Sequence, residues 1–122
     1  MPIRQNIIGS GTPAAQAIFI VGNATAGLTA TGTTQADALA LQASNNQFTT
    51  VAAGTGAILP SFAQPGDVLR VFNNGANALL VYPVTGGAIN NGATNAGFSV
   101  AANKGAQFVM VSATLWGVTL SA

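Results

Sequence analysis

Short apolar runs, separated by turn residues, divide the chain into segments of strand length. Residues rich in Val, Ile, Phe and Thr favour pleated strands. The segments are residues 17–22, 47–53, 57–59, 67–72, 78–83, 97–102, 106–112 and 115–120, with weaker candidates at 27–34, 36–43 and around Ile89. Residues 36–43 also suit a short helix by propensity, but their alternation favours a strand. Turn signals every 8–12 residues predict a single antiparallel β-sandwich of about eight short strands, with a jelly roll as the leading arrangement.

The first residues differ from the rest of the chain. Glycine, serine and proline interrupt this segment, and its apolar residues are isolated. We expect residues 1–16 to form an extended N-terminal arm and residues 17–122 to form the β-sandwich domain. An arm with apolar anchors is suited to strand addition onto another chain. The arm residues predicted to contact a neighbouring protein are Ile3, Arg4, Ile7 and Ile8.

The stretch DVLRVFNNGANALLVYP, residues 67–83, contains two apolar runs around a polar turn. Asn74-Gly75 suits the two-residue type I′ turn of a β-hairpin. Such a hairpin would be apolar on both faces, although a single sandwich covers only one face of each sheet. A second subunit, a partner or the chain's own arm would cover the other face. The residues predicted for a subunit interface are Leu69, Arg70, Val71 and Tyr82.

Charged residues are scarce. Three basic and two acidic side chains make up 4% of the 122 residues, against about 25% in an ordinary soluble domain. Three scattered cations do not form the basic surface that nucleic-acid binding needs. No apolar run approaches the roughly 20 residues of a spanning helix, so we expect no membrane partner. A neutral, amide-rich surface favours association, which indicates an obligate assembly, with a polar-coated monomer as the alternative.

The residue types that carry most enzyme chemistry are missing. The chain has no histidine and no cysteine, which excludes Ser–His–Asp and Cys–His nucleophile sets and zinc sites built on these residues. Asp37 and Asp67 are the only carboxylate side chains, and both stand where aspartates commonly stabilise turns or strand starts. We therefore predict a protein that is not an enzyme and that has no cofactor and no metal site.

Tyr82 and Trp116 are the aromatic residues with a polar group. The two side chains are of the type that stacks on sugar rings. Each lies in an apolar strand segment, however, so a place in the core or in an interface is the favoured interpretation.

The C-terminal half resembles a known group of proteins. NNGANALLVYPVTGGAINNGATNAGFSV, residues 73–100, and FVMVSATLWGVTL, residues 108–120, resemble small β-rich virion proteins of tailed bacteriophages, and the resemblance covers roughly residues 29–120. It implies a capsid decoration or cement protein on the outer head surface, made in the host bacterial cytoplasm. Its expected partners are the major capsid protein, whose subunits it would bridge, and further copies of itself, as a trimer rather than a dimer.

Two alternatives remain open at this point. One is a head-fibre or tail-fibre adhesin module that binds host glycans through Asn/Thr loops with Tyr82 or Trp116. The other is a self-assembling sandwich that has no capsid partner.

Overall fold

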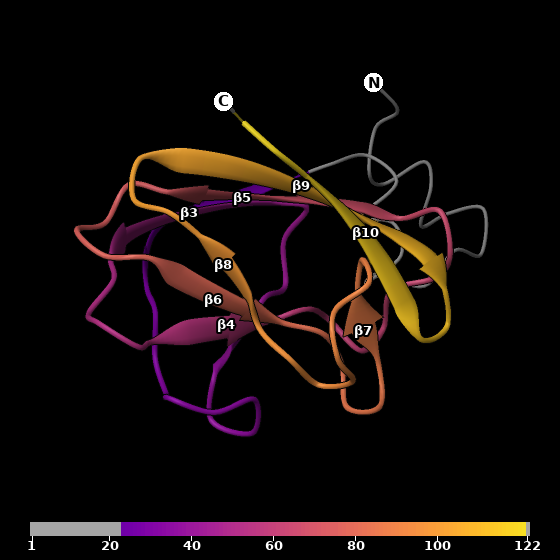
Figure 1. Cartoon of the computed structure of the whole chain (residues 1–122). Helices are drawn as coiled ribbons and strands as arrows, with labels where there is room; N and C mark the ends of the chain where they lie inside the picture. The colour runs from indigo at the N-terminus through magenta and orange to yellow at the C-terminus, as the bar shows by residue number, and fades with distance from the viewer. Residues whose placement is uncertain (1–22, 122) are drawn as a thin grey trace.

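The computed structural model of the chain describes residues 23–121 and contains ten β-strands and no helix in that range (Figure 1). The prediction of an all-β chain is confirmed. The expected arm, residues 1–16, and the strand expected over residues 17–22 lie outside the described residues.

The ten strands form two sheets that face each other as two layers (Figure 1). The six-stranded sheet has the order β1-β3-β5-β9-β10-β7, and the four-stranded sheet has the order β2-β4-β6-β8. Their bounds are β1 Ala24–Thr29, β2 Leu39–Ala40, β3 Asn45–Thr50, β4 Gly56–Ile58, β5 Val68–Asn73, β6 Leu79–Tyr82, β7 Ala88–Ile89, β8 Phe98–Val100, β9 Lys104–Ser112 and β10 Leu115–Leu120.

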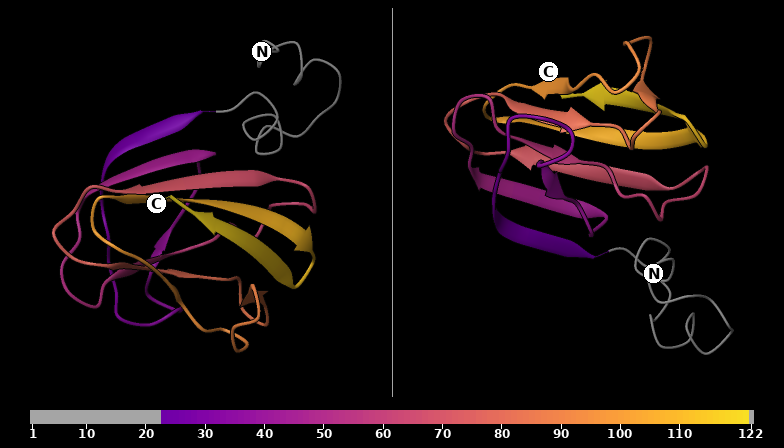
Figure 2. Two further views of the ribbon diagram at one scale, coloured as in Figure 1. Left: turned by 45° about the horizontal axis from the view of Figure 1, so that its top comes forward. Right: turned by 90° about the horizontal axis from the view of Figure 1, so that it is seen from below.

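The first six strands wind as a β-solenoid. Strands β1, β3 and β5 are parallel neighbours in one sheet, and β2, β4 and β6 are parallel neighbours in the other. The chain alternates between the sheets, so β1–β2, β3–β4 and β5–β6 are three stacked coils (Figure 2). Ala24 pairs with Asn45 and Asn45 with Arg70, so the coils advance by 21 and then 25 residues.

The expectation of a single antiparallel jelly-roll sandwich is therefore wrong. Parallel neighbours in one sheet require a crossover connection, which is usually an α-helix. Here the crossover between two strands of one sheet is a strand of the opposite sheet. Alternation and turn signals are the same for a solenoid coil and for a hairpin, and they do not reveal which strands become neighbours.

Residues 67–83 illustrate the difference, because they do not form the predicted hairpin. Strand β5 lies in the six-stranded sheet and β6 in the four-stranded sheet, so the polar turn is a corner between layers. Four side chains without exposed surface meet in the core from opposite sheets: Leu69, Val71, Leu79 and Val81. The two apolar runs share one core, and their outward residues lie on two different sheets, so they do not form the single second apolar face expected for a hairpin.

The C-terminal third of the chain closes the other end of the solenoid with antiparallel pairs. Strand β8 pairs with β6, β9 pairs with β5, and β10 pairs with β9. Strand β7 adds to β10 in parallel through two residue pairs. Each sheet therefore contains both parallel and antiparallel neighbours.

The core lies between the sheets. Its large aromatic members Phe48, Phe108 and Trp116 have no exposed surface, and Phe98 meets Phe108 edge to face with ring centroids 6.2 Å apart. Edge-to-face pairs of this kind add about 0.5–1.5 kcal/mol beyond their buried area.

A buried amide fastens the corner between β5 and β6. The Nδ2 atom of Asn73 donates to the carbonyl oxygens of Asn77 at 2.8 Å and Val100 at 2.9 Å, and its Oδ1 accepts from the Gly75 N–H at 3.0 Å. Asn73 has no exposed surface. Its side chain therefore forms hydrogen bonds with three backbone groups. Two of them lie in the corner between β5 and β6, and the third lies in β8.

Asn73→Ala is expected to lower the free energy of unfolding by about 3 kcal/mol, because each buried polar group left without a partner costs about 1–3 kcal/mol. Urea denaturation measures the change. Asn74→Ala is the matched control, since Asn74 is exposed and its Oδ1 accepts only an exposed bond from Gln47. Equal effects of the two substitutions would contradict the role assigned to Asn73.

Tyr82 is covered on the outer side of the four-stranded sheet. A Cβ atom added to Gly56 would lie 2.9 Å from the Tyr82 ring, and one added to Gly97 would lie 3.0 Å from it. The Tyr82 hydroxyl reaches the carbonyl oxygen of Thr33 at 3.4 Å. The ring therefore rests over two glycines, Gly56 in β4 and Gly97 directly before β8, and its hydroxyl reaches the loop between β1 and β2.

Gly56→Ala is expected to destabilise the fold by about 1–3 kcal/mol, the usual cost of overpacking. The new methyl group would also collide with the backbone oxygen of Leu80. Gly117→Ala is the control, because the nearest atom to its added Cβ is 3.7 Å away on Val111, and we expect a change within about 0.5 kcal/mol. Thermal unfolding of both variants gives the comparison, and a Gly56→Ala protein as stable as the control would refute the assigned packing.

Candidate functional site

An apolar groove crosses the outer face of the six-stranded sheet. It has a volume of about 270 Å³ and runs over β5, β9 and β10. We call it the outer-face groove, and it is lined by Arg70, Phe72, Gly105, Ala106, Gln107, Thr119, Leu120 and Ser121.

Strand register places these residues side by side. Arg70 pairs with Gln107 and Gln107 with Thr119, while Phe72 pairs with Gly105. Burial alternates along β5, so Arg70 and Phe72 point outward while their neighbours point into the core. Arg70, Phe72 and Gln107 belong to β5 and β9 at the centre of the sheet, while Thr119 and Leu120 lie at the end of β10 and pair with β9.

Phe72 and Gly105 determine the shape of the groove. A Cβ atom added to Gly105 would lie 3.0 Å from Cδ1 of Phe72, so the aromatic ring lies across the glycine. Phe72 remains 42% exposed and Leu120 47% exposed. Two large apolar side chains therefore face solvent at one groove.

The chemistry of the groove fits contact with another protein. Aromatic residues and arginine are enriched at the centres of protein interfaces, where they fill pockets of the partner. The Arg70 side chain can lay its methylene groups along apolar surface while its guanidinium stays at the edge. The amide of Gln107 and the hydroxyl of Thr119 complete a border able to form hydrogen bonds.

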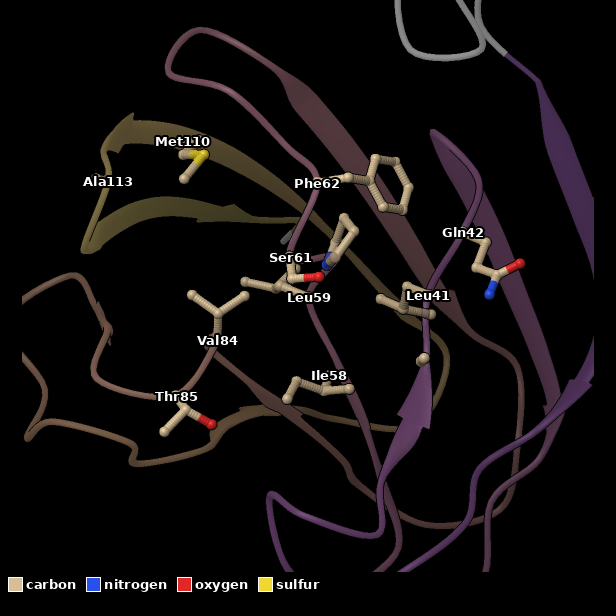
Figure 3. Close-up of a pocket in the computed structure, with 12 residues that line it drawn as sticks. Leu41, Gln42, Ile58, Leu59, Ser61, Phe62, Val84, Thr85, Met110 and Ala113 are labelled. Atoms are coloured by element: carbon tan, nitrogen blue, oxygen red, sulfur yellow. The ribbon is translucent and has the colours of Figure 1, made fainter. Parts of the chain in front are cut away.

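A second hollow, of about 530 Å³, lies at a corner of the solenoid (Figure 3). It follows the ends of β2, β4 and β6 and reaches the turn between β9 and β10. None of its lining residues is ionisable: Ala40, Leu41, Gln42, Ile58, Leu59, Pro60, Ser61, Phe62, Val84, Thr85, Met110 and Ala113. Leu41, Leu59 and Met110 in this corner pocket are buried core residues, whereas the lining of the outer-face groove includes the exposed side chains of Phe72 and Leu120.

The structure separates the residues predicted for a subunit interface. Leu69 and Val71 have no exposed surface and Tyr82 is 8% exposed, so these side chains are packed inside the protomer. The burial of Leu69 and Val71 follows from the solenoid, which turns these side chains toward the core, whereas Tyr82 is covered on the outer side of its sheet. Arg70 alone of this group lies on the surface, in the outer-face groove. The predicted arm contacts Ile3, Arg4, Ile7 and Ile8 lie outside the described residues.

Sequence reasoning missed Phe72, Gln107 and Leu120 as surface candidates. The alternation along residues 68–73 already placed Arg70 and Phe72 on one face, opposite Leu69 and Val71. That alternation was the available signal, and it was obscured because residues 67–83 were interpreted as one hairpin.

The two aspartates serve local turns. Asp37 Oδ1 accepts from the Thr34 N–H at 2.9 Å and the Thr34 hydroxyl at 2.8 Å, and Asp67 Oδ2 accepts from the Gln64 N–H at 2.8 Å. These bonds agree with the turn roles expected from the sequence. The hydroxyl of Thr34, followed by its backbone N–H, holds the pKa of Asp37 below the ordinary value. Within residues 23–121, no three His, Cys, Asp or Glu side chains gather as a metal site.

Tyr82 and Trp116 do not form a platform for sugar stacking. Trp116 has no exposed surface and Tyr82 is 8% exposed. A stacking platform needs an open ring face, whereas both rings are covered by the protein. Their burial agrees with the favoured interpretation that these aromatics are packing residues.

The described residues contain no candidate for a membrane-crossing helix.

The lowered pKa of Asp37 predicts the pH behaviour of the loop between β1 and β2. A depressed carboxyl pKa stabilises the folded loop above the ordinary value of 3.8, and this contribution is lost as pH falls through the lowered value. The Thr34 amide resonance in an NMR titration is expected to shift with a midpoint below 3.8. Asp37→Asn should remove this shift, and a midpoint at or above 3.8 in the unmodified chain would contradict the assignment.

Three comparisons with known proteins add no information about the groove. No protein-family model matches the chain, and the searches of curated proteins and of solved structures found no significant match.

Proposed function

We propose that the chain is a structural subunit of a larger protein assembly and that it binds its neighbours through the outer-face groove. The observation that carries this proposal is the pair of exposed apolar side chains, Phe72 and Leu120, on a rigid sheet face. Exposed apolar surface bordered by polar groups is typical of protein–protein contact sites.

The composition supports the same function. With five charged side chains in 122 residues, long-range repulsion between copies is weak. A neutral surface that also carries an apolar groove favours close association with another protein. Arg70 at the groove adds a directional contact, because a guanidinium presents five donors to carbonyl or carboxylate oxygens of a partner.

The specific assembly that we propose is the head of a tailed bacteriophage. The resemblance of residues 73–100 and 108–120 to small virion proteins supports it. In this role the chain is a decoration or cement protein on the outer capsid surface, where a homo-oligomer, proposed as a trimer, bridges major capsid subunits. A protein that binds only the assembled shell stabilises that shell by mass action.

Paired substitutions in the groove test this proposal. Phe72→Ser with Leu120→Ser should weaken binding to assembled capsids by more than tenfold, because loss of interface anchors typically costs about 2 kcal/mol or more. Capsids carrying the variant should release their DNA at a lower temperature than capsids carrying the unmodified chain. Co-sedimentation measures the binding, and a dye-release melting curve measures the shell.

Val111→Ser is the matched control. Val111 is 59% exposed on β9 and lies outside the groove lining, so its substitution removes apolar surface elsewhere on the molecule. This variant should bind and stabilise capsids like the unmodified chain. If the groove variant is folded and also behaves like the unmodified chain, the proposed binding surface is refuted. If capsids with and without the unmodified protein melt alike, the cement role is refuted.

A further inference from the structure

A row of polar side chains crosses the outer face of the six-stranded sheet, and Arg70 belongs to this row. Asn45 pairs with Arg70, Arg70 pairs with Gln107, and Gln107 pairs with Thr119. Residues that pair across neighbouring strands place their side chains on the same face of the sheet. The row therefore contains two amides, one hydroxyl and one guanidinium, and Arg70 is its only charged member.

In the part of the chain that the structure describes, no acidic side chain compensates the charge of Arg70. Asp37 and Asp67 are the only two acidic side chains of the sequence. Asp67 accepts from the Gln64 N–H in the turn before β5. Asp37 accepts from Thr34 in the loop between β1 and β2, which reaches the outer side of the other sheet. Neither forms an ion pair with Arg70, so the groove carries a fixed positive charge.

Phe72 lies one step further along the same face of β5. Residues i and i+2 of a strand point to the same side of the sheet and lie about 6–7 Å apart. The ring of Phe72 lies across Gly105 and is 42% exposed, so part of it can be covered by a ligand. The groove therefore presents a positive charge and an apolar surface at this spacing.

This pairing of charge and apolar surface indicates the chemistry of the ligand. A guanidinium binds a carboxylate through two parallel N–H···O bonds, which are roughly twice as strong as bonds between neutral groups. Nucleic-acid phosphates require several clustered cations, whereas Arg70 is the only cation in the groove lining. An acidic side chain of a protein, next to an apolar one, matches the groove.

A second copy of this chain does not provide that match. An isologous contact uses the same patch of both subunits, so it would bring two Arg70 guanidinium groups into one apolar interface. Burying a charge without a partner is costly. In a heterologous contact, the acidic side chains on offer would be Asp37 and Asp67, and both already accept hydrogen bonds within their own turns.

We infer that the outer-face groove binds an acidic segment of a different protein. One carboxylate of that segment pairs with the Arg70 guanidinium, and an apolar side chain beside it packs against Phe72. This inference rests on the proposed function, in which the groove binds a neighbouring protein. It adds that the neighbour is acidic at the contact and is not a further copy of this chain, so the copies in the proposed trimer meet through other surfaces.

Two small compounds test the inference on the isolated chain. 4-Phenylbutyrate carries an aromatic ring and a carboxylate at about the spacing of Phe72 and Arg70, and 4-phenylbutyramide is its neutral counterpart. Both compounds should shift the NMR amide resonances of Gly105 and Gln107. At low ionic strength the carboxylate should bind about fivefold more tightly than the amide, which is the scale of an exposed ion pair.

Arg70→Gln should remove this preference while leaving the affinity for the amide unchanged. Lys104→Gln is the matched control, because it removes the same charge from the residue next to Gly105, outside the groove lining. The control variant should keep the preference. Equal affinities of the two compounds for the unmodified chain, an unchanged preference in Arg70→Gln, or resonance shifts confined to other surfaces would overturn the inference.

Assembled capsids separate this inference from the proposed function. Arg70→Gln should weaken co-sedimentation with capsids by about tenfold and reduce its dependence on salt, because salt screens a charge pair. Lys104→Gln should bind like the unmodified chain. If Phe72→Ser with Leu120→Ser loses binding while Arg70→Gln retains it, the groove remains the binding surface and the acidic neighbour is refuted. If no groove variant loses binding, the proposed function is refuted, and this inference with it.

The mass of the isolated chain in solution tests the alternative occupant. Sedimentation should give the same oligomeric mass for Arg70→Gln and for the unmodified chain. A lower mass for Arg70→Gln would show that the groove binds a second copy, and this result would overturn the inference.

Discussion

Each time the chain crosses from one sheet to the other, its backbone N–H and C=O groups pass the hydrophobic core. The fold depends on giving these groups hydrogen-bond partners. Asparagine side chains supply such partners, and two of them show how. Asn73 serves three backbone groups at the corner between β5 and β6, and Asn46 donates to the carbonyl oxygens of Ala43 and Arg70, which links the second coil to the third. Because a primary amide both donates and accepts, one side chain can replace several missing ladder bonds without introducing a charge. The scarcity of charged residues and the abundance of asparagine in this chain are consistent with that role.

The same winding accounts for the outer-face groove. In the six-stranded sheet, the parallel strand β3 lies on one side of β5. The antiparallel strand β9 lies on the other side, with β10 next to β9. Phe72 lies across its β9 partner Gly105, where a side chain would crowd the ring. The aromatic side chain of Phe72 is thus displayed on a strand that pairs on both sides, where it cannot collapse inward. A binding surface of this construction needs little rearrangement on contact with a partner, which lowers the entropic cost of association.

Strand positions were largely predictable from the sequence, whereas strand partners were not. Residues 115–120 were expected as a strand and are β10, segment 78–83 contains β6, and segment 57–59 overlaps β4 in two residues. Local propensity and turn residues determine such segments. Partner choice in the solenoid depends on contacts between residues about 18–25 positions apart, and an Asn-Gly pair fits a corner as well as a hairpin. The burial of Leu69 and Val71 followed from this choice, and so did the exposure of Phe72. Arg70 lies on the surface, and its place in a subunit interface stays a prediction.

Antiparallel strands close one end of the solenoid, so its two ends differ. Because β8 and β9 occupy the free edges of the third coil, a coil cannot be appended after β6 without displacing them. New repeats can enter only before β1 or between existing coils, in units of about one coil length. The evolutionary lengthening or shortening of this architecture is therefore expected to occur on the N-terminal side, while the C-terminal third acts as an invariant terminator that keeps the same groove whatever the number of coils.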